Sequence, residues 1–397
     1  MATVACPFCY HKINQSRLAY RCLGRGVPGG KQTCTKQDNV QRQATIGVRE
    51  LSYPTFEVEA KGLLGTPKEA ACTTCGGITG RRACPVCHSP LSATFRTSRS
   101  PMVGVVGGKG AGKSVYLSVL YHELRTSVRR RFQADIGLAG DQQGSLGSAQ
   151  DWLKDYEDQL FEHGKLLRGT ESAPAGRRAP VVVEWRQPRR RLGVESLMTT
   201  VLSFYDAAGE DLSSDDRVHD QAYLGISDGL ILLLDPWQLP HAAKRIEVPA
   251  RAAGAAPPLQ VLRKVTDQLR TSHGVPSKRL KVPVAVVFAK MDAFFPVLGS
   301  NHPLMSNPPA LAGYDEVTGQ DTHEHVKALL DEYGADDIDA HLAVSYTNYR
   351  YFAVSALGAP PDYGADTVNE RGVQPFRVEE PLLWLLNRLG VLDRTRA

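Results

Sequence analysis

The sequence feature that most constrains this chain is a glycine-rich run of eight residues between an apolar segment and an amphipathic one. The run comprises Gly107, Gly108, Lys109, Gly110, Ala111, Gly112, Lys113 and Ser114. The apolar residues 101–106 predict a strand before the run, and the leucine spacing that begins after Val115 predicts a helix behind it. Between a strand and a helix, successive backbone N–H groups can turn toward phosphate oxygens, and the helix N-terminus adds positive partial charge. We therefore expect a phosphate-binding loop in which Lys113 reaches the outer phosphates and the Ser114 hydroxyl ligates Mg²⁺.

Strand-like and helix-like segments alternate from about residue 100 onward, which predicts an α/β domain built on a largely parallel sheet. Strands are expected at 181–185, 197–205, 230–234, 282–288 and 351–354, and helices at 149–167 and 379–389. The first two strands are separated by a turn and should form an antiparallel hairpin. We place this domain at residues 99–397, with insertions near 132–178, 236–258 and 296–345.

Metal binding is expected in the N-terminal residues 1–98, because all eight cysteines lie before residue 90. Six of them form Cys-x-x-Cys pairs, and without an export signal such pairs indicate metal ligands rather than disulfides. One tetrahedral Zn²⁺ site is expected from Cys72, Cys75, Cys84 and Cys87. A second site is expected from Cys6, Cys9, Cys22 and Cys34. A unit this small lacks a core, so the metal would hold it together.

The cysteine-rich unit could bind nucleic acid, dock proteins or simply hold its own fold, and its sequence favours the structural role. Aromatic residues do not alternate with basic ones between Cys6 and Cys87, as stacking on bases would require. The formal net charge is +5, and the arginine runs at 129–131 and 189–191 are more typical of solvated surfaces than of partner sites. Nucleic acid is therefore a possible partner that is not favoured.

The location expected for this chain is the cytoplasm. No apolar run approaches the roughly 20 residues that span a bilayer. The opening residues also lack a charged region followed by an apolar stretch. We expect no transmembrane segment.

A second nucleotide-binding element is expected where the strand at 197–205 ends on Asp206, with Gly209 and Glu210 shortly after it. An aspartate at the end of a strand can hold Mg²⁺ through water, and the N–H of a nearby glycine can sense a third phosphate. We expect Asp206 to be the magnesium partner.

Together with the glycine-rich loop, this pattern resembles the Ras-like (TRAFAC-class) P-loop GTPases, whose D-x-x-G switch matches Asp206 and Gly209. The family's N-K-x-D motif is matched by Lys290 and Asp292, which follow the strand at 282–288. A further similarity is the family's base-contacting turn, matched by Ser355, Ala356 and Leu357. The resemblance implies that GTP or GDP binds with Mg²⁺, that Asp292 accepts the guanine N1 and N2 hydrogens, and that the Lys290 stem covers the base.

Two positions limit what this resemblance implies. Ala289 stands where the family has an asparagine, so ATP is an alternative to GTP. Glu210 stands where many relatives have a glutamine that orients the attacking water, and phosphate would repel its carboxylate. Slow hydrolysis is therefore expected. Thr170 is our candidate for the switch threonine that closes over Mg²⁺.

The architecture also resembles the bacterial double-GTPase families, in which zinc knuckles precede a P-loop domain, and this resemblance implies a signalling role. We expect a GTP-binding regulatory switch that hydrolyses GTP slowly with Mg²⁺ and contacts a protein effector or regulator. The alternatives are a nucleotide-binding scaffold with little turnover and an ATP-using P-loop NTPase.

Overall fold

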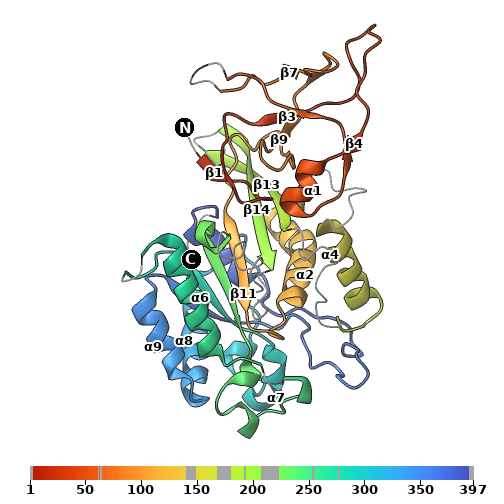
Figure 1. The fold of residues 1–397 in the computed structure, drawn as a ribbon. Coiled ribbons are helices and arrows are strands. Elements are labelled where there is room, and N and C mark those ends of the chain that lie inside the picture. Colours follow the sequence, from red (N-terminus) through yellow and green to blue (C-terminus); the bar gives the residue numbers. More distant parts are fainter. Residues whose placement is uncertain are drawn as a thin grey trace. The chain divides into compact units, whose positions relative to one another are not determined.

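A computed structural model of the chain, shown in Figure 1, describes residues 3–60, 62, 65–139, 149–167, 180–191, 194–206, 223–252, 255–275 and 278–392. The chain divides into two compact units. The first contains Met1–Met102, Asp135–Leu153 and Ser172–Phe204, and the second contains Val103–Ala134, Lys154–Glu171 and Tyr205–Ala397. These units group the chain differently from the division expected near residue 98. The zinc-binding domain expected at residues 1–98 stays a prediction.

The largest sheet has seven strands and is mixed, in the order β12, β13, β14, β11, β15, β16, β17. Their bounds are Met102–Gly107 for β11, Asp135–Leu138 for β12, Val181–Arg191 for β13, Val194–Asp206 for β14, Gly229–Leu234 for β15, Val284–Phe288 for β16 and Tyr349–Ala353 for β17. Adjacent strands are parallel from β11 through β15 and β16 to β17, whereas β13 is antiparallel to both β12 and β14. The expected α/β class and the expected hairpin are confirmed.

Apolar side chains on both faces explain why the central strands of the second unit are parallel and buried. Every residue of β11, β15 and β16 is buried, and β15 reads Gly-Leu-Ile-Leu-Leu-Leu. Strands buried on two faces need helices on both sides, which the connections between parallel strands supply. The described α-helices of this unit include α2 (Lys113–Glu123), α3 (Arg129–Phe132), α6 (Pro258–His273), α7 (Phe295–Leu298), α8 (Glu316–Glu332), α9 (Asp336–Ser345) and α10 (Glu380–Arg388).

These helices have distinct neighbours within the second unit. Helix α8 packs against β17, and α10 packs against β15 and β16. Helix α9 contacts both α6 and α8, which Figure 1 labels. The core between the helices and the sheet includes fully buried aromatic residues such as Phe288, Phe294 and Tyr351. This packing holds the carboxyl ends of β11, β15 and β16 in a fixed arrangement, where the candidate site lies.

Two features of the chain differ from the sequence-based expectation. The short strand β12 lies in a region expected to be an insertion, because Asp-Ile-Gly-Leu carries no clear period and becomes a strand only through its antiparallel pairing with β13. The helical segments after the glycine-rich loop and at 149–157 (α4, Ala149–Glu157) each pass into a π-helical turn, at 124–128 and at 158–162.

The cysteine-rich part of the first unit is built from very short strands. They are β1 (Thr3–Ala5), β2 (Lys12–Asn14), β3 (Ala19–Arg21), β4 (Gln37–Asp38), β5 (Leu51–Ser52), β6 (Thr55–Phe56), β7 (Ala70–Ala71), β8 (Ile78–Thr79), β9 (Arg82–Ala83) and β10 (Pro90–Leu91), with one helix, α1 (Val40–Ile46). Four of them form a sheet in the order β10, β9, β3, β6. Helix α1 begins where the Asn39 side chain accepts the Arg42 N–H and ends at Gly47, whose φ is 72°.

Candidate zinc centres and nucleotide site

Three Cys-x-x-Cys pairs adopt one backbone geometry in the first unit. In each, the first cysteine's carbonyl accepts the N–H of the residue four positions later, as in Cys6 and Tyr10 at 2.9 Å. The first cysteine's own N–H bonds the carbonyl five positions later. The residue after the second cysteine has positive φ in all three pairs, at Tyr10, Gly76 and His88. The turns therefore present both sulfurs of a pair to one side, the geometry of a zinc knuckle.

The structure joins these turns differently from the expected pairing, which is corrected here. One buried group contains Cys6, Cys9, Cys84 and Cys87, and the other contains Cys22, Cys34, Cys72 and Cys75. The first and last cysteine pairs of the sequence thus enclose the inner four. Sequence proximity suggested that the pairs at 72 and 84 would share a metal. Cys84 follows β9 and Cys22 follows β3, and because these two strands are antiparallel, the two cysteines lie at opposite ends of the strand pair.

The sulfur geometry of both groups fits a tetrahedral metal. Neighbouring sulfurs lie 3.9 Å apart between Cys6 and Cys87, 3.9 Å between Cys9 and Cys84, and 3.5 Å between Cys22 and Cys75. With Zn–S bonds of roughly 2.3 Å, a tetrahedron places its sulfurs roughly 3.8 Å apart. Both groups could therefore hold Zn²⁺, as expected from the cysteines.

Electrostatics also favour a cation in each group, because buried thiolates need compensating charge. Burial raises the pKa of the Cys6 thiol well above its ordinary value, and burial raises that of Cys34 to about 12. The N–H of Gly77 lowers the pKa of Cys75 to about 7. Four neighbouring sulfurs cannot all ionise without a metal, whereas Zn²⁺ ligation requires the thiolate form.

The glycine-rich loop of the second unit lies between β11 and α2, as its sequence context required. Gly112 has a φ of 90°, a conformation that side chains disfavour, and it directly precedes the first residue of α2. The amine of Lys113 folds back over the loop and donates to the carbonyls of Gly107 and Gly108, at 3.1 Å each. The half-buried Ser114 and Val115 follow in the first turn of the helix. Gly112 has no side chain that could cap the backbone N–H groups at the start of α2.

The residues expected to contact a base also come together. Asp292 is buried and accepts a hydrogen bond of 2.5 Å from the Ser355 hydroxyl, and the N–H of Gly358 donates to that hydroxyl at 2.8 Å. Burial raises the pKa of Asp292 above its ordinary value, although the Ser355 hydrogen bond opposes the rise. Ala356 and Leu357 are half-buried in the same turn.

Lys290 lies at the junction between this pair and the glycine-rich loop. It has a positive φ of 55°, and its amine donates to the Gly110 carbonyl at 2.7 Å and to the Asp235 carboxylate at 2.8 Å. Asp235 was not among the residues expected at this site. The available signal was the apolar run of β15 ending on an aspartate, the same pattern that singled out Asp206.

Other expected site residues lie outside what the structure describes. Thr170, Gly209 and Glu210 fall in the undescribed segments, and Asp206 is described only as the last backbone position of β14. Their proposed contacts with Mg²⁺ and phosphate stay predictions.

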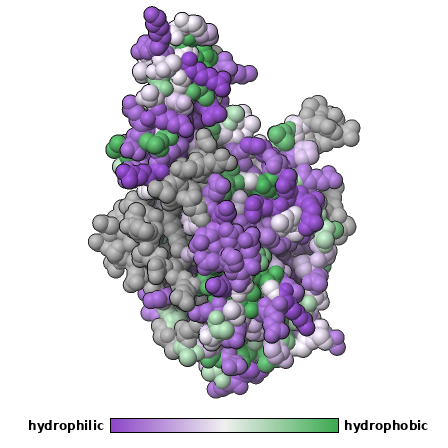
Figure 2. All heavy atoms as spheres, turned by 90° about the vertical axis from the view of Figure 1, so that its right-hand side faces the viewer, coloured by the Kyte–Doolittle hydropathy of each residue, from purple (hydrophilic) through white to green (hydrophobic). Residues whose placement is uncertain are grey.

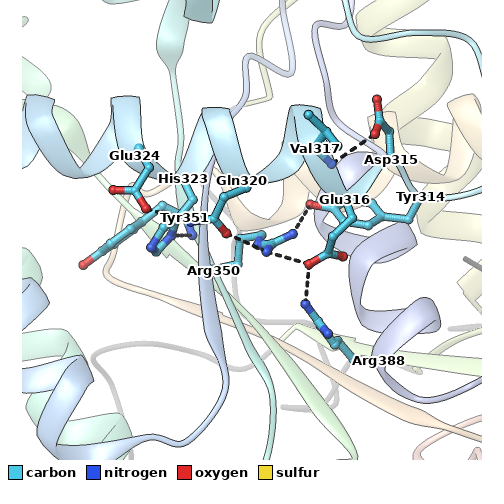
Figure 3. A network of polar contacts seen from close by, with 10 residues as sticks. All are labelled: Tyr314, Asp315, Glu316, Val317, Gln320, His323, Glu324, Arg350, Tyr351 and Arg388. Carbon is cyan, nitrogen blue, oxygen red and sulfur yellow. Dashed lines mark hydrogen bonds and ion pairs between the residues drawn. The ribbon is translucent and has the colours of Figure 1, made fainter. Parts of the chain in front are cut away.

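A network of polar contacts, shown in Figure 3, fixes β17 and thereby the turn that begins at Ser355. The buried guanidinium of Arg350 donates to Glu316 at 2.8 Å and to Gln320 at 2.9 Å, both on α8. Arg388 on α10 donates to the same oxygen of Glu316 at 2.7 Å. The network therefore ties α8, β17 and α10 together.

The first unit also has a pocket of about 840 Å³, whose lining includes Arg81, Leu91, Leu138, Glu184 and Leu197. Leu197 is 63% exposed there. Figure 2 shows hydrophobic residues scattered in small groups among hydrophilic ones on one face of the molecule. Among the described residues, no helix combines the length and apolar character needed to cross a bilayer.

Fold and site define a class: a mixed α/β protein with a seven-stranded sheet and two buried four-cysteine groups that could hold Zn²⁺. No family model matches the chain. A protein of Mycolicibacterium smegmatis named "Putative ESX-1 scaffolding and assembly protein SaeC" is 29% identical to it over 331 residues, which cover 78% of this chain and 80% of that protein.

This similarity corrects the expected function. The expectation of a GTP-hydrolysing regulatory switch, and with it the description of the chain as a signalling hydrolase, is wrong, because the similar protein is named for scaffolding and assembly. The expectation came from the resemblance to Ras-like GTPases, and a shared fold does not by itself imply a shared activity.

Proposed function

We propose that this chain is an assembly scaffold, a protein that holds partner proteins together while a larger complex forms. The observation that carries the proposal is the similarity over 331 residues to a protein named for ESX-1 scaffolding and assembly. The match extends over most of both proteins, so a single shared motif does not account for it. Two metal-held clusters would suit this role by keeping a small unit rigid. The pocket beside the exposed Leu197 is a candidate contact surface for a protein partner.

The scaffold proposal is tested in the organism that carries the gene. Deleting the gene should reduce the assembled fraction of an ESX-1-type complex, followed by native electrophoresis of one tagged subunit. Restoring the wild-type chain should recover assembly. The variant Leu197→Glu should recover it less well than Leu311→Glu, a matched control in the second unit that is 41% exposed. Unchanged amount and size of the complex after deletion would overturn the proposal.

We further propose that the second unit is a Ras-like P-loop fold that binds a nucleotide, with guanine as the favoured base, and that the scaffold holds this ligand with Mg²⁺. Three features support this: the left-handed Gly112 before α2, the Lys113 amine over the loop, and the buried Asp292 beside Ser355. A buried carboxylate is costly alone and gains from a base that donates two hydrogen bonds. Nucleotide binding would stabilise the second unit through mass action, without requiring turnover.

Calorimetric titration of the zinc-loaded chain with GTP, GDP and ATP in Mg²⁺ tests this second proposal. Lys113→Ala should weaken binding by about a hundredfold, because a charged contact to phosphate is lost in a partly desolvated loop. Lys281→Ala is the control: its side chain is exposed before β16 and lies outside the glycine-rich loop, and its loss should change the affinity by about twofold or less. No binding of any of the three nucleotides would refute the nucleotide site and leave the scaffold proposal standing.

A further inference from the structure

The amine of Lys290 is engaged by this chain on three sides. It donates to the Gly110 carbonyl at 2.7 Å and to the Asp235 carboxylate at 2.8 Å, and it lies 4.0 Å from the centre of the Trp237 ring. A lysine ammonium has three N–H donors, and an aromatic face attracts a cation. The charge of Lys290 is therefore matched within the protein.

Asp235 is built to hold this amine. It follows the last residue of β15, which is parallel to β11, so it stands at the same end of the sheet as the glycine-rich loop. Its side chain is 8% exposed. One carboxylate oxygen accepts a hydrogen bond from the backbone N–H of Trp237 at 3.1 Å, which caps the start of a 3₁₀ turn. The other oxygen accepts a hydrogen bond from the Lys290 amine. Both oxygens are thus held by separate partners, which leaves the carboxylate little freedom.

We propose that Asp235 is a positioning residue of the nucleotide site, and that it acts by clamping Lys290 between β15 and the glycine-rich loop. The inference rests on the nucleotide binding proposed above. Ala289 has no polar side-chain atom, so the residue before Lys290 cannot tie its loop to the glycine-rich loop. The contact between Asp235 and Lys290 supplies that tie from the neighbouring strand.

The clamp acts on the apolar stem of Lys290. Contacts of the amine with Gly110 and Asp235 restrict the positions of the four methylene groups beside the loop. The stem lies close to the loop, because a β-carbon placed on Gly112 would be 4.0 Å from the lysine Cε. When a base stacks on the stem, an ordered lysine side chain loses less conformational entropy than a mobile one would. Asp235 should therefore affect the affinity for a nucleotide but not the affinity for phosphate groups alone.

The test compares two probes, GTP and inorganic tripolyphosphate, each with Mg²⁺ and the full zinc-loaded chain. The variants are Asp235→Asn, Lys290→Met and the two combined. Asparagine keeps an oxygen to accept the Trp237 N–H, so Asp235→Asn removes mainly the charged contact to Lys290. Asp235→Asn should raise the Kd for GTP by about tenfold. The Kd for tripolyphosphate should stay within about twofold, and the combined variant should bind GTP no more weakly than Lys290→Met.

Asp339→Asn is the matched control, because Asp339 also pairs with a lysine, Lys327, at 2.8 Å. It should leave both Kd values unchanged. A GTP affinity that Asp235→Asn leaves within about twofold of wild type, while Lys113→Ala abolishes it, would overturn the inference alone. A parallel loss of tripolyphosphate binding would do the same, since it would show general damage. Absence of GTP, GDP and ATP binding to the wild-type chain would remove the nucleotide site itself.

Discussion

The sulfur of Cys9 lies 3.9 Å from the sulfur of Cys84, although 75 positions separate the two residues in the sequence. The same group brings Cys6 to 3.9 Å from Cys87. The other four cysteines form a group between these two pairs in the sequence. One metal would thus join the two ends of the cysteine-rich segment 6–87, and the second would close the segment between them. Loop closure of this kind removes conformations from the unfolded chain.

The pairing predicts a specific pattern of zinc loss. Elemental analysis of the wild-type chain should find about two zinc ions per molecule. Replacing Cys9 and Cys84 together by serine should leave about one zinc, because both residues serve the same site. Replacing Cys9 and Cys22 together should leave none, because these two residues belong to different groups. The reverse result, with Cys9 and Cys84 removing both ions, would restore the pairing suggested by sequence proximity.

The buried carboxylate of Glu50 should be important for stability. It accepts hydrogen bonds from Arg21 at 2.8 Å and from Arg42. Burial lowers the pKa of the Arg42 guanidinium. Glu50→Gln would leave two buried guanidiniums without their counter-charge, so the free energy of unfolding should fall by about 3 kcal/mol. Urea denaturation of the zinc-loaded chain measures this change.

The control for that prediction is Glu332→Gln. Glu332 pairs with Arg245, but the two side chains are 46% and 48% exposed. Its loss should change the free energy of unfolding by less than about 0.5 kcal/mol. Equal effects of the two substitutions would show that the Glu50 cluster contributes no more than a surface ion pair.

Gly358 should tolerate no side chain. Its φ is 80°, and a β-carbon there would lie 1.8 Å from the carbonyl oxygen of Gln374. Gly372 has a similar φ of 75°, but a β-carbon there would have no atom within 4 Å. Substitution of Gly372 therefore measures backbone strain without steric overlap. Gly372→Ala should cost about 1 kcal/mol of unfolding free energy. Gly358→Ala should cost at least about 2 kcal/mol more, measured by urea denaturation. Similar losses in the two variants would argue against this packing.

Glu380 should make stability depend on pH. Burial raises the pKa of its carboxyl from 4.5 to about 7, although Arg377 donates to it at 3.0 Å. Its second oxygen is buried without a hydrogen-bond partner among the described residues, which disfavours the charged form. At a pH between these two pKa values, the Glu380 carboxyl keeps its proton in the folded state but has lost it in the unfolded state. The free energy of unfolding should therefore fall as pH rises, by up to about 1.4 kcal/mol per pH unit.

Comparison of wild type with Glu380→Gln isolates this group from others that titrate in the same range. The difference in unfolding free energy between the two proteins should change by roughly 3 kcal/mol from pH 4.5 to pH 7, with wild type losing stability relative to the variant. Denaturation curves collected at half-unit pH intervals measure it. A difference that stays constant over this range would mean that Glu380 has an ordinary pKa in the folded protein.

Much of the fold could be predicted from the sequence because its signals are local. The apolar runs of β11, β15 and β16 were each long enough to predict a buried strand, and the two strands around 192–193 predicted a hairpin. β12 was missed because four residues with a glycine carry no period, and its strand form depends on hydrogen bonds to β13.

The sequence by itself indicated that the eight cysteines could serve as metal ligands and that glycine residues would turn the chain before α2, since dihedral preferences and ligand chemistry belong to individual residues. Only the tertiary structure decided that Cys9 shares a group with Cys84. It also decided that the carboxylate of Asp235 contacts the amine of Lys290. Those relationships depend on how strands far apart in sequence align in space. Packing sets that alignment, and no local pattern records it.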